Sequence, residues 1–221
     1  MIILISVKRF FENEYNRFER LCQGFGMSDS DATLAWSNLL KHYTEPHRHY
    51  HTFEHVGAML TALDCIAGTL PIDERGLALI EMAIWFHDAI YDPRLSTNEE
   101  DSAELFLQLV GASMSEAESQ TVARLILATD PRRSRNDVED EKVMVDIDLL
   151  VLAADAPGYR AYTAAIRKEY AHVPQDAFAK GRSAVLLGIL AKPIYLTEHF
   201  ADREKLARAN LEREIGELQG R

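Results

Sequence analysis

The chain has 221 residues, of which 47% are hydrophobic, so it can bury a sizeable core, and one large domain is expected. With 35 acidic against 24 basic residues the formal charge is −11, and the densest basic stretch is only 131–135. Affinity for a nucleic-acid duplex depends on neutralising phosphates, so this composition argues against such a partner, whereas a small anionic ligand is compatible with it if a metal or local arginines supply positive charge.

The same composition predicts a cytoplasmic protein that has no membrane partner. Cys22 and Cys65 are too few for a disulfide framework in a chain of this size, which favours a reducing compartment. The opening "MIILIS" is followed by Lys8 and Arg9, and it lacks the charged start, length and cleavage site of a signal peptide. No stretch approaches the roughly 18 apolar residues that a membrane helix needs.

Helical periodicity dominates the chain, and strand alternation is hard to find. In chain order the pattern predicts helices over 29–42 and 53–67. A third helix is predicted to end before Pro93, and Leu77, Ile80, Ile84 and His87 form its apolar face. Further helices are predicted over 98–110, 115–128, 140–153, 159–170, 175–190 and 201–218. Ser115 and Glu118 have the spacing of a capping box. Since no repeat or long linker divides residues 1–221, we expect an all-α, single-domain helical bundle.

Four of the eight histidines lie within nine positions, at His47, His49, His51 and His55. On a helix, His51 and His55 would share a face with their Cβ atoms about 5–6 Å apart. That spacing suits two imidazoles on one metal, or one on a metal and one on its substrate. A solvated helix start is the alternative, and the pair alone does not decide between them.

The His87-Asp88 pair follows the apolar run "AIWF" and is predicted to fall in the last turns of a buried helix. Adjacent helical residues project about 100° apart, yet both can reach a cation held where helices cross. A buried carboxylate needs a partner or a metal to offset its desolvation. The alternative is that Asp88 only orients His87.

A third element is "VMVDIDLLVL", residues Val143–Leu152, where Asp146 and Asp148 interrupt an otherwise apolar run. Acids in such a run are costly unless they are compensated, so we expect at least one of them to be a metal ligand. The alternative is a cap or an ion pair at a surface turn.

Taken together, the ordered motifs resemble the HD superfamily of metal-dependent phosphohydrolases. The closest resemblance is to a largely uncharacterised bacterial branch, on the segments "HRHYHTFEH", "WFHDAIYDP", "NEEDSA" and "DIDLLVL", across about residues 30–200. The resemblance implies an HD-type helical domain and a metal held by His55, His87, Asp88 and Asp148. It favours Asp148 over Asp146, which would then lie behind the ligands. Two imidazoles and two carboxylates suit Mn, Fe, Co, Ni or Zn.

"YHTFEH" also resembles the "YHNxxH" of cyclic-nucleotide phosphodiesterases, in which the second histidine is a ligand and the first protonates the leaving oxygen. This resemblance implies that His51 is a catalytic acid, although Thr52 replaces the asparagine and a cyclic nucleotide is not implied. Glu99 is a candidate to orient the water, and Arg48 to neutralise a phosphate; the alternatives are an exposed carboxylate at a helix start and an ordinary surface arginine. The expected function is therefore hydrolysis of a small phosphorylated substrate, such as a nucleotide, by a metal-activated water.

Two other functions remain open at this point. One is a non-catalytic metal or nucleotide sensor that retains the ligands. The other is a di-iron oxygenase, as in an oxidative offshoot of the same superfamily, which would need a second set of ligands from His47, His49, Asp92 and Glu99.

Overall fold

The computed structural model describes residues 12–133 and 136–220, and all regular secondary structure in these ranges is helical. The α-helices are α2 (Glu12–Gly24), α3 (Asp29–Tyr43), α4 (Phe53–Ile66), α5 (Glu74–Phe86), α6 (Asn98–Leu109), α7 (Glu116–Leu127), α8 (Glu139–Asp148), α9 (Ala156–Glu169), α10 (Gln175–Leu190) and α11 (Glu204–Leu218). Short 3₁₀ segments are η1 (Ala67–Thr69), η2 (Gly111–Ser113), η3 (Leu149–Ala153) and η4 (Glu198–Arg203). The predicted all-α bundle is confirmed. The opening "MIILIS" and part of the basic stretch 131–135 lie outside the described residues.

Most predicted helices occur, and the capping box at Ser115 and Glu118 is formed in full. The pattern missed α2, although its buried residues Tyr15, Phe18 and Cys22 recur at spacings of three and four. The abundance of charged residues in that helix concealed the apolar stripe. None of the described helices is long and apolar enough to cross a membrane.

Two predicted helix ends are wrong in ways that affect the site, and one start is correct but leaves His51 outside its helix. The helix before Pro93 ends at Phe86, so the His87-Asp88 pair lies at the helix end and not in its last turns. The helix predicted over 140–153 stops at Asp148 and continues as the tighter η3. His51 precedes α4, whose N-cap is Thr52, so His51 and His55 do not share a helical face.

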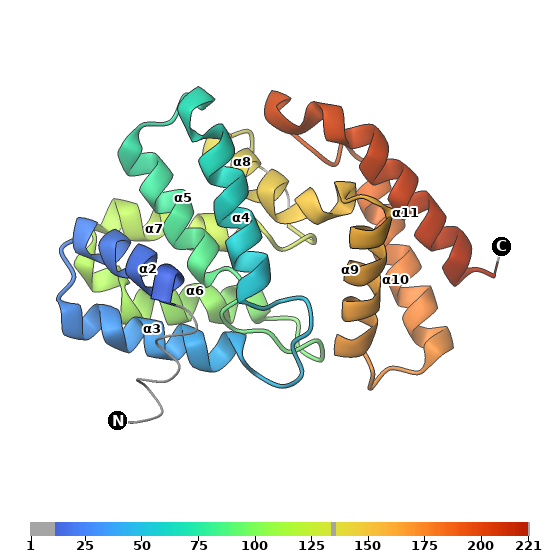
Figure 1. Cartoon of the computed structure of the whole chain (residues 1–221), viewed down its shortest axis with the longest axis horizontal. Coiled ribbons are helices and arrows are strands. Elements are labelled where there is room, and N and C mark those ends of the chain that lie inside the picture. The colour runs from blue at the N-terminus through green and yellow to red at the C-terminus, as the bar shows by residue number, and fades with distance from the viewer. Residues whose placement is uncertain (1–11, 134–135, 221) are drawn as a thin grey trace.

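One hydrophobic core extends from α2 to α11. Phe18, Trp36 and Trp85 pack in its centre with ring centroids 5.5–5.9 Å apart. In Figure 1, α2 to α7 form one side of the molecule, α9 to α11 form the other, and α8 with η3 connects them. The start of α4 and the ends of α5, α8 and α9 supply residues of the site described below.

The connection between the two sides is fixed by buried polar side chains. Asp146 accepts hydrogen bonds from the backbone N–H groups of Leu196 and Thr197 and from the Thr197 hydroxyl, at 2.7–3.0 Å. Asn210 of α11 donates to the carbonyls of Leu152 and Ala154 at 2.8 and 2.9 Å. Because buried polar groups are costly to leave unpaired, these bonds hold η3 in one position.

Candidate metal centre

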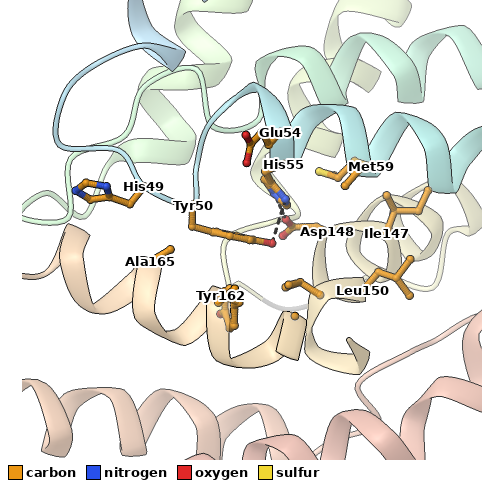
Figure 2. A pocket seen from close by; sticks show the side chains of 14 residues that line it. His49, Tyr50, Glu54, His55, Met59, Ile147, Asp148, Leu150, Tyr162 and Ala165 are labelled. Carbon is orange, nitrogen blue, oxygen red and sulfur yellow. Dashed lines mark hydrogen bonds and ion pairs between the residues drawn. The ribbon is translucent and has the colours of Figure 1, made fainter. Parts of the chain in front are cut away.

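Two histidines and an aspartate from three different segments meet at the junction of the two sides. His55 lies in the first turn of α4, His87 caps the end of α5 and Asp148 ends α8. The His55 Nε2 atom lies 3.2 Å from Nε2 of His87 and 3.1 Å from Oδ1 of Asp148. One donor atom from each of the three falls within 4.8 Å of the others. Figure 2 shows the Asp148 carboxylate directed at the His55 ring.

Asp88 lies beside the two histidines. Its Oδ2 atom is 2.9 Å from Nε2 of His87 and 3.8 Å from Nε2 of His55. Burial would raise the pKa of Asp88, but the charges of His87, His51 and His55 hold it far below its usual range. The carboxylate is therefore the ionised form that a cation requires.

The spacing of these donor atoms fits a coordination shell. A cation about 2.1 Å from each ligand would separate adjacent ligands by about 3.0 Å in octahedral and about 3.4 Å in tetrahedral geometry. The three closest pairs of donor atoms are 2.9, 3.1 and 3.2 Å apart, and His87 to Asp148 and His55 to Asp88 are 3.7 and 3.8 Å apart. Two imidazoles and two carboxylates also match the mixed nitrogen and oxygen set of Mn, Fe, Co, Ni or Zn. The group of His55, His87 and Asp148 therefore fits a divalent transition metal, and Asp88 lies beside this group, next to His87.

The outer hydrogen bonds set the orientation of both imidazoles. His87 Nδ1 lies 2.9 Å from the carbonyl of Ile84, which can only accept, so Nδ1 carries the proton and Nε2 presents a lone pair in the neutral ring. His55 Nδ1 lies 3.1 Å from the Tyr50 hydroxyl. Burial would lower the pKa of His87, but Asp88 and Asp148 raise it to about 9. Without a metal, a proton on His87 would offset the negative charge of Asp88 and Asp148.

Asp146 and Asp148 lie on different faces of α8. The Asp146 carboxylate is fully buried and accepts the hydrogen bonds from Leu196 and Thr197 described above, whereas the Asp148 carboxylate faces the histidines. Two residues apart on an α-helix is about 200° of rotation, so one cation cannot be reached by both. The structure places Asp148, and not Asp146, beside the histidines.

Arg48 has a different position from the one expected of a phosphate-binding arginine. Its side chain is fully buried, and its guanidinium donates to the carbonyls of His51, Asp88 and Ala89 at 2.6–3.1 Å. Its Nε donates to Glu45 at 3.0 Å. Arg48 therefore joins the histidine loop to the end of α5, and its donors are not available to a ligand.

Sequence reasoning missed Glu169, the last residue of α9, which organises the histidine loop. Its Oε1 atom accepts from the backbone N–H groups of His49, Tyr50 and His51 at 2.7–3.1 Å. Its Oε2 atom lies 2.7 Å from His51 Nδ1 and accepts from the Tyr91 hydroxyl at 3.1 Å. An acidic residue in the last turn of a helix interacts unfavourably with the helix dipole, and this unusual position could have indicated a specific role for Glu169.

Replacement of Glu169 by glutamine is expected to destabilise the protein and to change its acid sensitivity. Burial would raise the pKa of Glu169, but the hydrogen bond and charge of His51 and the N–H groups of the loop lower it from 4.5 to about 2. A carboxylate with a lowered pKa stabilises the fold above pH 4.5 and loses that contribution as the pH falls towards 2. The lowering corresponds to on the order of 3 kcal/mol.

Urea unfolding of both proteins at several pH values measures this difference. The gap in unfolding free energy between wild type and Glu169→Gln should be largest near pH 7 and should narrow between pH 4.5 and 2. A gap that does not change over this range would show that the charge of Glu169 does not stabilise the loop.

Two hollows border the candidate metal centre, and Tyr50, Asp148 and Tyr162 line both. We call the first the groove; it has a volume of about 430 Å³, lies between α4 and α9, and is shown in Figure 2. We call the second the cavity; it has a volume of about 390 Å³ and is lined by His51, Asp88 and Glu99, among others. Because both His51 and Asp88 line the cavity, a molecule bound there would lie beside both side chains.

Glu99 lies in the first turn of α6 and lines the cavity. Burial raises the pKa of Glu99, the charges of Asp130 and Asp88 add to the rise, and Arg132 opposes it. Such a rise moves a carboxylate towards the range in which it can accept a proton from water.

The other residues considered for a second metal do not gather around one. His47 is exposed, and its Nε2 lies 2.8 Å from the Tyr91 carbonyl. Asp92 accepts from the backbone N–H of Arg94, and His49 lines the groove. Among residues 12–133 and 136–220, the group of three potential metal ligands is the one formed by His55, His87 and Asp148.

Searches of protein-family models, of curated proteins and of solved structures found nothing that matches this chain.

Proposed function

We propose that the protein is a metal-dependent phosphohydrolase that acts on a small phosphate ester, with nucleotides as the first substrates to test. The observation that supports this most directly is that the donor atoms of His55, His87, Asp88 and Asp148 converge beside a cavity that His51 also lines. The resemblance of the four sequence motifs to the HD superfamily points to the same chemistry.

A divalent cation in this site would activate water and polarise the phosphoryl oxygens. His55 and His87 would hold it through Nε2, and Asp88 and Asp148 would offset its charge. His51 is fixed through Nδ1 by Glu169, which leaves Nε2 to face the cavity and to donate a proton to the leaving oxygen. Glu99 would orient the water and accept its proton.

We also propose that this reaction takes place in the cytoplasm. Both cysteines are free in the structure, Cys22 in the core and Cys65 at the surface. Unpaired cysteines are typical of a reducing compartment.

A phosphate-release screen tests the function. The purified protein would first be analysed for bound metals, then stripped and reloaded with Mn, Fe, Co, Ni or Zn, and assayed for phosphate release from nucleoside mono-, di- and triphosphates and from simple phosphate monoesters. We expect metal-dependent release that is lost on stripping. Thermal stabilisation by a nucleotide with no product formed would select the sensor, and two irons per chain with an oxygen-dependent spectrum would select the oxygenase.

A further inference from the structure

The arginines that line the cavity are already neutralised. In the described chain they are Arg132 and Arg182. Arg132 lies 2.8 Å from Asp130 and 3.6 Å from Glu99, and Arg182 lies 2.8 Å from Glu214. Arg182 also donates to the Tyr162 hydroxyl at 3.0 Å. Neither arginine offers an unpaired positive charge to a ligand.

The cavity also carries a surplus of negative charge. Asp88, Asp148, Glu99 and Asp130 all line it, and Arg132 offsets only one of these four charges because Arg182 is paired with Glu214 outside the lining. One divalent cation offsets two of these charges and leaves little attraction for more than one phosphate group. A di- or triphosphate would place further negative charge beside Glu99 and Asp130. The electrostatics therefore favour a ligand that carries a single phosphate.

An apolar recess continues the cavity between α9 and α10. It has a volume of about 320 Å³ and shares Ile166, Tyr170, Arg182 and Val185 with the cavity. The rest of its lining is Val173, Ala177, Phe178 and Gly181. Two large apolar side chains in the cavity lining remain exposed, Leu95 at 53% and Val185 at 48%. Exposed apolar side chains grouped at a cavity indicate a surface that a ligand covers.

We propose that the substrate is a phosphate monoester of an uncharged, apolar alcohol, preferably an aromatic one, with the phosphate beside Asp88, Asp148 and His51 and the apolar group in the recess. This inference rests on the proposed hydrolase function and names its substrate class. It follows from the continuity of the recess with the cavity that His51 lines, because a leaving group protonated by His51 lies on that side of the metal centre.

In the reaction, the bond between phosphorus and the alcohol oxygen breaks, and its electron pair stays on that oxygen, which takes a proton from His51. A new bond forms between phosphorus and the oxygen of water. The proton that the water releases passes to Glu99, and through solvent it restores His51. The products are the free alcohol and inorganic phosphate, and no oxidant or reductant is needed.

The recess can be filled without disturbing the fold. A Cβ atom added at Gly181 of α10 meets nothing within 4 Å, and the same is true of Gly188 two helical turns later, which lines neither the cavity nor the recess. Both glycines are exposed, and leucine favours a helix more than glycine does. Gly181→Leu and Gly188→Leu therefore form a matched pair, of which only the first occupies the recess.

The experiment measures phosphate release from 1-naphthyl phosphate, ribose 5-phosphate and ATP by the metal-loaded full chain and both variants. We expect wild type to have the highest kcat/KM for 1-naphthyl phosphate. Gly181→Leu should raise KM for 1-naphthyl phosphate by about tenfold and leave KM for ribose 5-phosphate unchanged, while Gly188→Leu should change neither.

A wild-type preference for ATP or ribose 5-phosphate, or equal effects of Gly181→Leu on all substrates, would overturn this inference and leave the hydrolase function intact. Absence of phosphate release from every ester by metal-loaded protein would overturn the proposed function and the inference with it.

Discussion

Replacement of Asp88 by alanine is expected to abolish both metal content and turnover. The change removes the carboxylate oxygen that lies 2.9 Å from Nε2 of His87, and with it one negative charge that a cation needs. Losing even an indirect partner of a ligand costs about 10- to 100-fold in metal affinity, so losing a ligand should cost at least the upper end of that range. Phosphate release should fall below detection at micromolar metal.

Elemental analysis of the purified variant, followed by titration with the preferred metal, measures the loss. The backbone at position 88 stays held, because Arg48 donates to its carbonyl and not to its carboxylate. Asp92→Ala is the matched control, since Asp92 is nearby and caps the N–H of Arg94 outside the donor group. Full activity in metal-free Asp88→Ala protein would refute the proposed mechanism.

Replacement of His51 by glutamine is expected to slow turnover and to leave the metal in place. His51 lines the cavity but lies outside the donor group, with its ring centroid 6.1 Å from that of His55. Loss of a positioned proton donor lowers the rate by about 10²- to 10⁴-fold. Metal content per chain should equal that of wild type.

The leaving group shows whether the lost function is proton donation. An ester of 4-nitrophenol needs little protonation to depart, so His51→Gln should be impaired far less with 4-nitrophenyl phosphate than with an alkyl phosphate. His49→Gln is the control, because His49 is on the same loop but lines the groove and not the cavity. An equal loss of rate with both esters would assign His51 a structural role.

The sequence predicted most helices because their apolar spacing was regular, and it predicted the convergence at the metal centre because costly residues interrupted apolar runs. Asp88 and the pair Asp146 and Asp148 were found in that way, and the resemblance to the HD superfamily favoured Asp148. Helical rotation shows that Asp146 and Asp148 cannot both reach one cation, but it does not show which of them does. That depends on the residues that face each carboxylate, which lie about 50 and 93 positions away in the chain. The assignment of Asp88 and Asp148 as metal ligands stays a prediction.

The roles of Glu169 and Arg48 depended on tertiary contacts that no local pattern contains. Glu169 lies about 120 residues along the chain from the loop whose N–H groups donate hydrogen bonds to it. Arg48 lies within the histidine motif, but its buried position follows from the end of α5, about 40 residues later in the chain. The helix ends at Phe86 and Asp148 were also missed, because no glycine or proline marks either boundary.

The buried guanidinium of Arg48 holds the backbone of the site without using the side chains that would carry its chemistry. It donates to the main-chain carbonyls of His51, Asp88 and Ala89, which every amino acid possesses, and to none of their side chains. Side chains at these positions can therefore be exchanged while the two segments remain joined. This makes the site suitable for redesign, since ligands or proton donors of another kind could be introduced at 51 and 88 on a backbone that is already in place.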